Sequence, residues 1–577
     1  MNRERTLAHC AAAWAAERGD AIAYTFLADG AADARSLTWA ELHRRAGIGA
    51  SALSAASAVG KPVLLMLPSG LEFVSSLFAC WYAGAIPVPV CLPRHHRTMN
   101  RLHALIADAG ARFAFAEPNV QQRFSADEAT RDAVSGLTWM TPTPAGYEQD
   151  HAIDPQGCSQ DVGLIQYTSG STGTPRGVVV TNANLMNNNA TIAEACGHDQ
   201  KSTIGGWLPL FHDMGLIGLV SQAAFTGARC VYMAPERFLM RPWTWLQMIS
   251  DYKICSSPAP NFGYDLCVEK VSEQQKQTLD LSGWRNALNG SEPVRPSTLQ
   301  RFAAAFASRG FPESAFFPCY GLAEATLFVT GPGDGRCRTL LNSDGTRAAP
   351  GSPTGHVACG RSFGDTRVAI VDPQMRRRLA ERTIGEIWVS GSSCAQGYWG
   401  KAQATAATFG TRMESAEAED NCAWLRTGDL GMQVDGELFI TGRLRELIIL
   451  AGRNLFPVDL EQTVEKANAA IAGSATAAFS VDIDSAERLI LAAEIRRELV
   501  GRGSAVADDI DLAAIARNVR AAIAAEHDVT PHEIVLLKPG ALPRTTSGKL
   551  NRGAARQAYL DGVLDRLEAR SHVVAKH

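Results

Sequence analysis

Short apolar runs alternate with stretches of helical periodicity through the first four hundred residues of the chain. Residues 62–68 (PVLLMLP) form a continuous apolar run that is typical of a buried strand. Residues 70–84 carry apolar side chains at helical spacing and end in glycine, and residues 85–90 (AIPVPV) return to an extended pattern. Because alternating strands and helices favour crossover connections, this pattern predicts a layered α/β fold with largely parallel sheets.

The pattern changes in the last third of the chain. Residues 434–440 place an Asp-Gly pair between apolar flanks, which predicts a hairpin. Further elements are expected after it: a helix from about Val458, strands at 488–495 and 533–540, and a helix over 511–526. Since 577 residues are too many for one ordinary core, we predict two domains, of residues 1–442 and 443–577.

Composition and charge exclude several classes of protein. Hydrophobic residues make up 46% and charged residues 20%, with a formal net charge of −4. These values are typical of a globular protein without a basic face, so we expect no nucleic-acid partner. The longest apolar candidate, residues 214–225, is too short to span a bilayer and contains Ser and Gln. We therefore expect no membrane insertion.

The N-terminus and the cysteines indicate the compartment. The first twenty residues are interrupted by His9, Glu17 and Arg18, which favours an amphipathic helix over a signal peptide. The thirteen cysteines include no C-x-x-C pair, and His95 and His96 have no partners nearby to complete a zinc set. Free thiols in a reducing cytoplasm are expected.

The strongest local signal is the segment 168–177 (TSGSTGTPRG). It contains three Gly, three Thr and two Ser between two apolar β-rich runs. Such a loop exposes backbone N–H groups and hydroxyls that suit phosphate oxygens. It lacks the Lys-Ser/Thr of a Walker A loop. A flexible, hydroxyl-rich hairpin without ligand is the alternative interpretation.

Several segments together resemble the adenylate-forming superfamily of acyl-CoA synthetases, adenylation domains and luciferases. Segment 168–177 resembles its phosphate loop, and the other motifs occur in order along nearly the whole chain: LPLFHDMGLIG (208–218), NGSEPV (289–294), CYGLAEATL (319–327), GEIWVSG (385–391), GYW (397–399), LRTGDLG (425–431), GRLRELIILAGRNLFPVDLE (442–461) and PRTTSGKL (543–550). The resemblance implies a large multi-layer N-terminal domain, a small mobile α+β C-terminal domain, and ATP and Mg²⁺ as cofactors.

The resemblance also implies a set of site residues. It makes Lys549, Glu324 and His212 catalytic, with Glu324 also the Mg²⁺ ligand and Arg445 the hinge. The residues that it places at the nucleotide are Thr168, Ser169, Gly170, Ser171, Thr172, Gly173, Thr174, Arg176, Ser291, Glu292, Tyr320, Gly321, Leu322, Ala323, Asp429, Ile440 and Arg443.

Physical chemistry supports these roles, although each residue type also has a plain structural explanation. Asp429 suits ribose hydroxyls but also an ordinary turn, and Glu324 offers Mg²⁺ a hard oxygen but also suits a helix start. Tyr320 offers a face to adenine or simple core packing. Lys549 offsets the charge of phosphoryl transfer, whereas an isolated lysine in a polar loop is usually solvated surface. His212 is either a gate for the acyl substrate or a satisfied core histidine.

Two positions depart from the family pattern. Arg176 stands where the phosphate loop usually carries Lys, and it keeps the charge while adding donors. Arg445 stands at a hinge position that is commonly Asp or Lys. Within the superfamily, NGSEPV, GLAEATL, GRSFGD (360–365) and GRNLFPVDLE are most similar to fatty acyl-AMP ligases.

That branch implies a specific pair of substrates. A medium- or long-chain fatty acid is activated to the acyl-adenylate and then passed to the phosphopantetheine thiol of a separate holo acyl carrier protein, since no Gly-Gly-x-Ser attachment motif follows Leu550. Two alternatives remain at this point: a fatty acyl-CoA synthetase that uses free coenzyme A, and a silent adenylate- or fatty-acid-binding protein. The inserted segment that excludes coenzyme A in the branch has two candidates here, residues 330–360 and 372–383.

Overall fold

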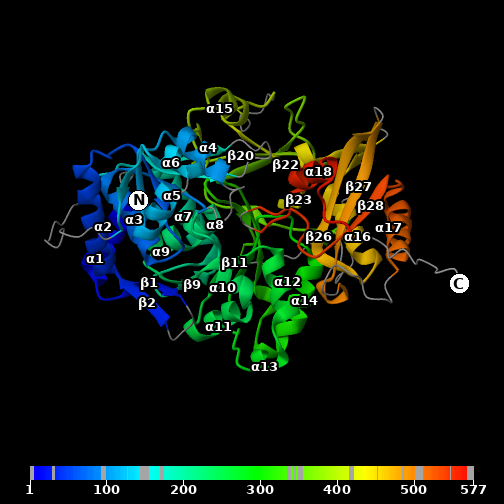
Figure 1. Cartoon of the computed structure of the whole chain (residues 1–577), viewed down its shortest axis with the longest axis horizontal. Coiled ribbons are helices and arrows are strands. Elements are labelled where there is room, and N and C mark those ends of the chain that lie inside the picture. Colours follow the sequence, from blue (N-terminus) through cyan, green and yellow to red (C-terminus); the bar gives the residue numbers. More distant parts are fainter. Residues whose placement is uncertain are drawn as a thin grey trace.

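The computed structural model describes residues 5–28, 33–92, 99–126, 128–142, 155–168, 175–333, 340–342, 346–348, 355–414, 421–450, 453–483, 486–500, 511–545 and 548–567. Its N-terminal three quarters contain stacked sheets and helices, and its C-terminal part forms a smaller body at one side (Figure 1).

The largest sheet is mostly parallel, as the alternating pattern predicted. Its seven strands lie in the order β13 (Phe316–Pro318), β12 (Asn286–Asn289), β11 (Ser256–Ala259), β9 (Thr203–Gly206), β10 (Arg229–Met233), β1 (Ile22–Leu27) and β2 (Ala34–Thr38). Only the pair β1–β2 among these is antiparallel. A second sheet is wholly parallel and consists of β4 (Ile86–Pro89), β3 (Pro62–Met66), β5 (Phe113–Ala116) and β6 (Thr138–Met140).

Helices cover these sheets and bury their apolar faces. One group consists of α1 (Leu7–Arg18), α2 (Trp39–Ala55), α3 (Leu71–Ala83), α7 (Asn182–Cys196) and α9 (Gln222–Thr226), and its side chains share one apolar cluster with strand residues. A second cluster is rich in aromatic rings and lies around α11 (Trp243–Tyr252), α12 (Asn261–Lys270) and α14 (Pro296–Phe306). Helix α7 begins with a capping box between Thr181 and Asn184 and ends at Gly197 in the left-handed conformation.

Within the first four hundred residues, where largely parallel sheets were expected, residues 367–390 pair antiparallel instead, and the hairpin predicted at residues 434–440 belongs to the same sheet. There the strands β19 (Arg367–Val371), β20 (Gly385–Ser390), β22 (Leu425–Val434) and β23 (Glu437–Arg443) form an antiparallel sheet. Antiparallel neighbours need only short connections, and β22 and β23 are joined by the predicted Asp435-Gly436 turn. A further antiparallel set pairs β7 (Val162–Thr168) with β8 (Arg176–Thr181), and β8 with β21 (Gly397–Tyr398).

The C-terminal part has its own sheet and core. Strands β26 (Ile471–Ile483), β27 (Ala486–Ile495) and β28 (Glu533–Leu537) pack with α16 (Pro457–Ala467), α17 (Leu512–His527) and α18 (Arg552–Leu560). Its two apolar clusters take their buried members from residues 448–567. The chain reaches this body from β23 through a short 3₁₀ turn, Leu444–Glu446.

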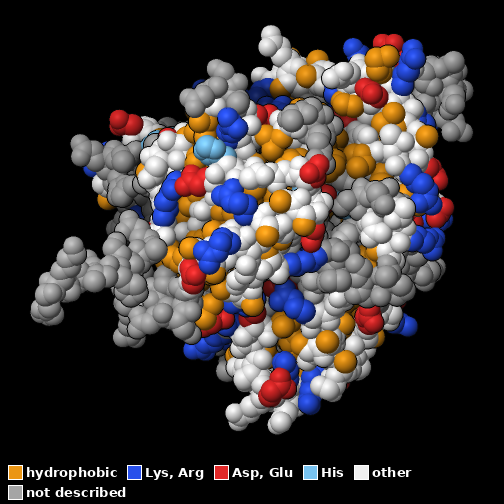
Figure 2. All heavy atoms as spheres, turned by 90° about the vertical axis from the view of Figure 1, so that its right-hand side faces the viewer, with side chains coloured by type: hydrophobic (Ala, Val, Ile, Leu, Met, Phe, Trp, Pro, Cys, Tyr) orange, Lys and Arg blue, Asp and Glu red, His pale blue; other side chains and the backbone are white. Residues whose placement is uncertain are grey.

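Surface charge agrees with the near-neutral composition. On the face seen in Figure 2, acidic and basic side chains are interspersed rather than gathered by sign. None of the helices within the described ranges is long and apolar enough to cross a membrane.

Candidate functional site

One end of the site is a carboxylate that two side chains hold in place. Asp429 on β22 lies opposite Arg443 on β23 in the strand register, and the Arg443 Nε donates to its Oδ1 at 2.9 Å. The Tyr320 hydroxyl donates to the Asp429 Oδ2 at 2.8 Å. Burial, reinforced by the Asp429 charge, raises the pKa of Tyr320, so its hydroxyl stays a donor. The carboxylate is therefore fixed in orientation, as a group that accepts hydrogen bonds from a ligand's hydroxyls must be.

Glu324 lies in a tight turn of the adjacent segment. The turn begins at β14 (Tyr320–Gly321), where a Cβ on Gly321 would lie 1.8 Å from the Leu327 carbonyl oxygen, so only glycine fits. Glu324 occupies a short 3₁₀ helix, Ala323–Ala325, and Thr326 follows it with a positive φ of 68°. A β-branched residue in that conformation is strained and needs support from its surroundings.

The loop after β20 provides that support. The Ala395 N–H donates to the Glu324 carbonyl at 2.8 Å, and the Thr326 hydroxyl donates to the Ser393 carbonyl at 2.6 Å. The Tyr398 hydroxyl donates to the Glu324 Oε1 at 2.8 Å. Three hydrogen bonds thus position both the backbone and the carboxylate of Glu324.

Side chains of helix α7 form hydrogen bonds with the same turn and the same loop. The Asn188 side chain donates to the Phe328 carbonyl at 2.9 Å and accepts from the Phe328 N–H at 3.1 Å. The Asn184 amide donates to the carbonyls of Ser392 and Cys394. Sequence reasoning missed these asparagines, although a run of three (187–189) within a helical pattern is unfavourable for a helix and could have indicated another role.

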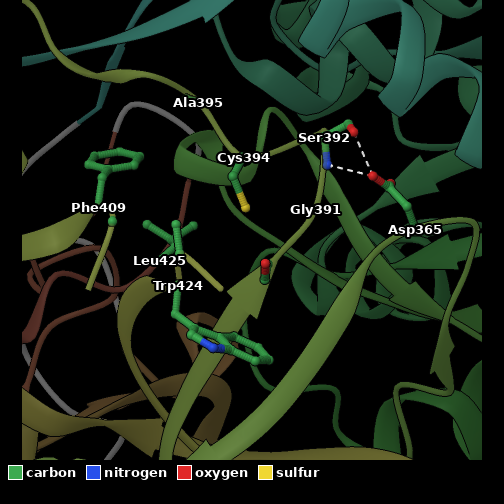
Figure 3. A pocket seen from close by; sticks show the side chains of 11 residues that line it. Asp365, Gly391, Ser392, Cys394, Ala395, Phe409, Trp424 and Leu425 are labelled. Carbon is green, nitrogen blue, oxygen red and sulfur yellow. Dashed lines mark hydrogen bonds between the residues drawn. The ribbon is translucent and has the colours of Figure 1, made fainter. Parts of the chain in front are cut away.

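The same loop lines a cavity of about 340 Å³ (Figure 3). Asp365 accepts hydrogen bonds from the Ser392 N–H at 2.9 Å and from its hydroxyl, and thereby fixes the start of the loop at the cavity wall. Trp424, Leu425 and Phe409 line the cavity as well.

The predicted phosphate loop connects paired strand ends. Thr168 and Arg176 are partners in the antiparallel β7–β8 register. Residues 169–174 lie outside the described residues. The Arg176 guanidinium lies 5.5 Å from the centre of the Tyr398 ring, which places this cation beside the tyrosine that contacts Glu324.

His212 and Asp213 lie at the start of α8 (Asp213–Gly215), which continues as a π-helix, Leu216–Ser221. The His212 ring is half-buried against Phe211, at 4.7 Å between ring centres. Phe211 is tied to β7 because its carbonyl accepts a hydrogen bond from Gln166 at 2.8 Å. Burial raises the pKa of Asp213, although the Lys549 charge acts in the opposite direction.

Lys549 reaches the site from the small C-terminal body. Its loop is closed by the Thr545 N–H, which donates to the Lys549 carbonyl at 2.7 Å. Burial lowers the pKa of Lys549, and the charges of Asp213, Glu292 and Asp429 oppose that shift. The structure therefore brings this distant lysine among the acidic groups of the large domain.

The remaining predicted residues have mixed surroundings. Ser291 is exposed with a positive φ of 77°, and Glu292 accepts the Asn261 N–H at 3.0 Å, which ties it to the start of α12. Leu322 is half-buried and Ala323 buried within the Glu324 turn. Ile440 is half-buried on β23, and Arg445 is exposed in the Leu444–Glu446 turn.

The carboxylate of Glu324 is an oxygen donor of the kind that Mg²⁺ prefers. Within the ranges that the structure describes, no three His, Cys, Asp or Glu side chains gather to hold a metal. Mg²⁺ commonly takes one or two carboxylates and completes its shell with water and phosphate oxygens. Burial raises the pKa of Glu324, and a cation bound beside the carboxylate would act in the opposite direction by favouring its charged form.

Comparison with known proteins gives whole-length matches. Residues 11–399 match the family model described as AMP-binding enzyme, and residues 445–569 match one described as Disco-interacting protein 2-like, AMP domain. The chain is 38% identical to a medium-chain-fatty-acid–[acyl-carrier-protein] ligase from Moorena producens, over 96% of this chain and 95% of that protein. It is 35% identical to a long-chain-fatty-acid–AMP ligase from Mycolicibacterium smegmatis, over 96% and 94% of the two chains. A crystal structure of a fatty acid AMP ligase from Legionella pneumophila covers 98% of this chain and 97% of its own, with 31% identity and a TM-score of 0.73.

Proposed function

Since this chain belongs to the AMP-binding enzymes, we propose that it activates a medium- or long-chain fatty acid with ATP. The products are an acyl-adenylate and pyrophosphate, and the acyl group then passes to the phosphopantetheine thiol of a separate acyl carrier protein. The observation that carries the proposal is the Asp429 carboxylate, oriented by hydrogen bonds from Tyr320 and Arg443, whose charge also acts on Lys549 of the C-terminal body. The relatives named for fatty acid–AMP and fatty acid–carrier ligase activity support the choice of substrate and acceptor.

In the first half-reaction a fatty carboxylate oxygen attacks the α-phosphorus of ATP. The bond from that phosphorus to the bridging oxygen of pyrophosphate breaks, and the electron pair leaves with pyrophosphate. Lys549 offsets negative charge on the carboxylate and α-phosphate as they approach, and Arg176 with the 168–174 loop binds the leaving phosphates. Asp429, held by Tyr320 and Arg443, orients the ribose.

Glu324 is the proposed Mg²⁺ ligand. A bound Mg²⁺ supplies charge neutralisation to the triphosphate. This chain's own contribution is to hold the carboxylate still, through the hydrogen bonds from Ala395 to its backbone and from Tyr398 to its side chain.

In the second half-reaction the thiol sulfur attacks the acyl carbon, and AMP leaves with the electron pair of the broken carbon–oxygen bond. Lys549 has no role at the acyl carbon, so the small domain can turn away. We place the domain boundary after residue 442 and the hinge at Arg445, because this residue lies exposed in the short turn between β23 and the small domain.

The decisive test divides one reaction between two acceptors. Purified protein is incubated with ATP, Mg²⁺ and radiolabelled dodecanoate, and then with either free coenzyme A or a holo acyl carrier protein. We expect acyl-adenylate to accumulate with coenzyme A and to be consumed only by the carrier. Efficient acyl-CoA formation would overturn the proposed acceptor, and absence of adenylate across a panel of acids would overturn the enzymatic proposal. The cytoplasmic location stays a prediction that cell fractionation can test.

A further inference from the structure

The loop that carries Lys549 packs directly on helix α12 of the large domain. Gly548 has a left-handed φ of 84°, and a Cβ there would lie 2.9 Å from the Phe262 ring. One helical turn further along α12, Asp265 accepts a hydrogen bond from the Ser474 hydroxyl of β26 at 3.2 Å. The contact between α12 and β26 lies where the green and orange parts meet in Figure 1.

Ser474 also joins a charged pair that crosses between the domains. The Arg295 Nη1 donates to the Glu465 Oε2 at 2.7 Å and to the Ser474 hydroxyl oxygen at 3.0 Å. The Arg295 and Glu465 side chains are only 11% and 13% exposed, and Asp265 is 7% exposed. Because these groups are shielded from water, their interactions are screened much less than those of a surface ion pair.

The same serine is linked to the residue before Lys549. The Arg544 guanidinium donates to the Ser474 carbonyl at 2.9 Å and to the Gly548 carbonyl at 3.2 Å. A single side chain therefore connects the domain contact at Ser474 to the loop that presents Lys549.

The backbone at Ser474 carries strain that its hydroxyl contacts explain. Its φ is +56°, in the left-handed region that non-glycine residues rarely adopt, and the β26–β27 register shifts between Ile471 and Thr476. This irregularity directs the Ser474 side chain toward Arg295 and Asp265. Strain of this kind persists where the surrounding structure gains from it.

We propose that Arg295, Asp265, Ser474 and Glu465 form a latch that positions Lys549 for adenylation. The latch holds the small domain in the adenylation orientation and opens before the acyl group is transferred to the thiol. In any orientation that separates β26 from α12, the hydrogen bonds and the ion pair among these groups break and the groups become hydrated. The latch therefore stabilises one orientation only. The inference rests on the proposed function, since it assigns the two half-reactions to two orientations.

The sharpest test is Ser474→Gly. Glycine removes the hydroxyl and suits the positive φ, so the substitution does not strain the fold. Ser480→Gly is the matched control, because Ser480 is on the same strand and its hydroxyl contacts Glu487 within the small domain. Glu465→Gln is a second variant that keeps the shape but removes the charge opposite Arg295.

Each variant is measured in both half-reactions: pyrophosphate release with dodecanoate, and single-turnover transfer from preformed acyl-adenylate to the holo carrier. We expect Ser474→Gly to slow adenylate formation about tenfold, as loss of a hydrogen bond to charged groups implies. The Michaelis constants for ATP and dodecanoate should change less than twofold, and transfer should be unchanged or faster. The latch would be overturned if the rates of both half-reactions fell equally, or if the rate of adenylation in Ser474→Gly were no lower than in Ser480→Gly.

Hydrogen exchange separates this inference from the proposed function, because it needs no turnover. Amides of α12 should exchange faster in Ser474→Gly than in the wild type or in Ser480→Gly. Faster exchange in a protein that adenylates no acid would show that these residues hold the two domains together, and would reject both the function and the role of the latch in adenylation. Unchanged exchange in an active enzyme would reject the latch and leave the function standing.

Discussion

A buried ion cluster in the small domain joins the helix after Lys549 to the segment after the proposed hinge. Arg552, the first residue of α18, donates two hydrogen bonds to Glu461, at 2.7 and 2.8 Å, and one to Glu446 at 2.6 Å. The Arg552 side chain is 17% exposed and that of Glu461 is fully buried. Arg552→Ala leaves a buried carboxylate without its partner, which costs about 3–5 kcal/mol of folding free energy.

The control is Arg566→Ala in the same domain. Arg566 pairs with Glu533, but the two side chains are 45% and 33% exposed, so losing this pair should cost about 1 kcal/mol or less. Urea unfolding followed by circular dichroism gives both values. The double variant Arg552→Met with Glu461→Leu should recover most of the loss, because no unpaired charge stays buried. If Arg552→Ala destabilises no more than Arg566→Ala, the cluster does not stabilise the small domain in this way.

Three further predictions concern the site. Lys549→Ala should slow adenylate formation by several orders of magnitude and slow transfer from preformed adenylate far less; equal loss in the two assays would contradict the role given to it. Asp429→Ala should raise the Michaelis constant for ATP, and an unchanged constant in steady-state assays would contradict the ribose contact. Burial raises the pKa of Glu324 and the hydrogen bond from the Tyr398 hydroxyl opposes that shift, so Tyr398→Phe should raise this pKa further. A protonated carboxylate binds Mg²⁺ poorly, so the acid limb of the pH–rate profile for adenylation should move to higher pH in this variant. Tyr559→Phe is the control: it loses a hydrogen bond to Glu533 and should leave the acid limb where it is.

Local sequence determined the elements of this protein and the identity of most candidate residues. Apolar runs predicted β3, and the Asp-Gly pair predicted the β22–β23 turn, because each depends on neighbours in the chain. Motif order identified the family before any contact was known, and the whole-length matches confirmed it. The antiparallel pairing of β20 with β19 and β22 was missed, because the direction in which strands pair through irregular connections leaves no signal in the local sequence.

Tertiary structure decided how those residues are supported and brought together. The family resemblance predicted Tyr320 at the nucleotide, but only the folded chain shows that its hydroxyl donates to Asp429. Asn188 and Tyr398 act on the Glu324 turn from segments more than seventy residues away, and no local pattern encodes such a contact. The electrostatic interaction of Lys549 with Asp213 likewise depends on how two parts of the chain pack, since it joins groups separated by more than three hundred residues. Periodicity and turn chemistry act over a few residues, whereas these contacts depend on the whole fold, which is the physical reason for the division.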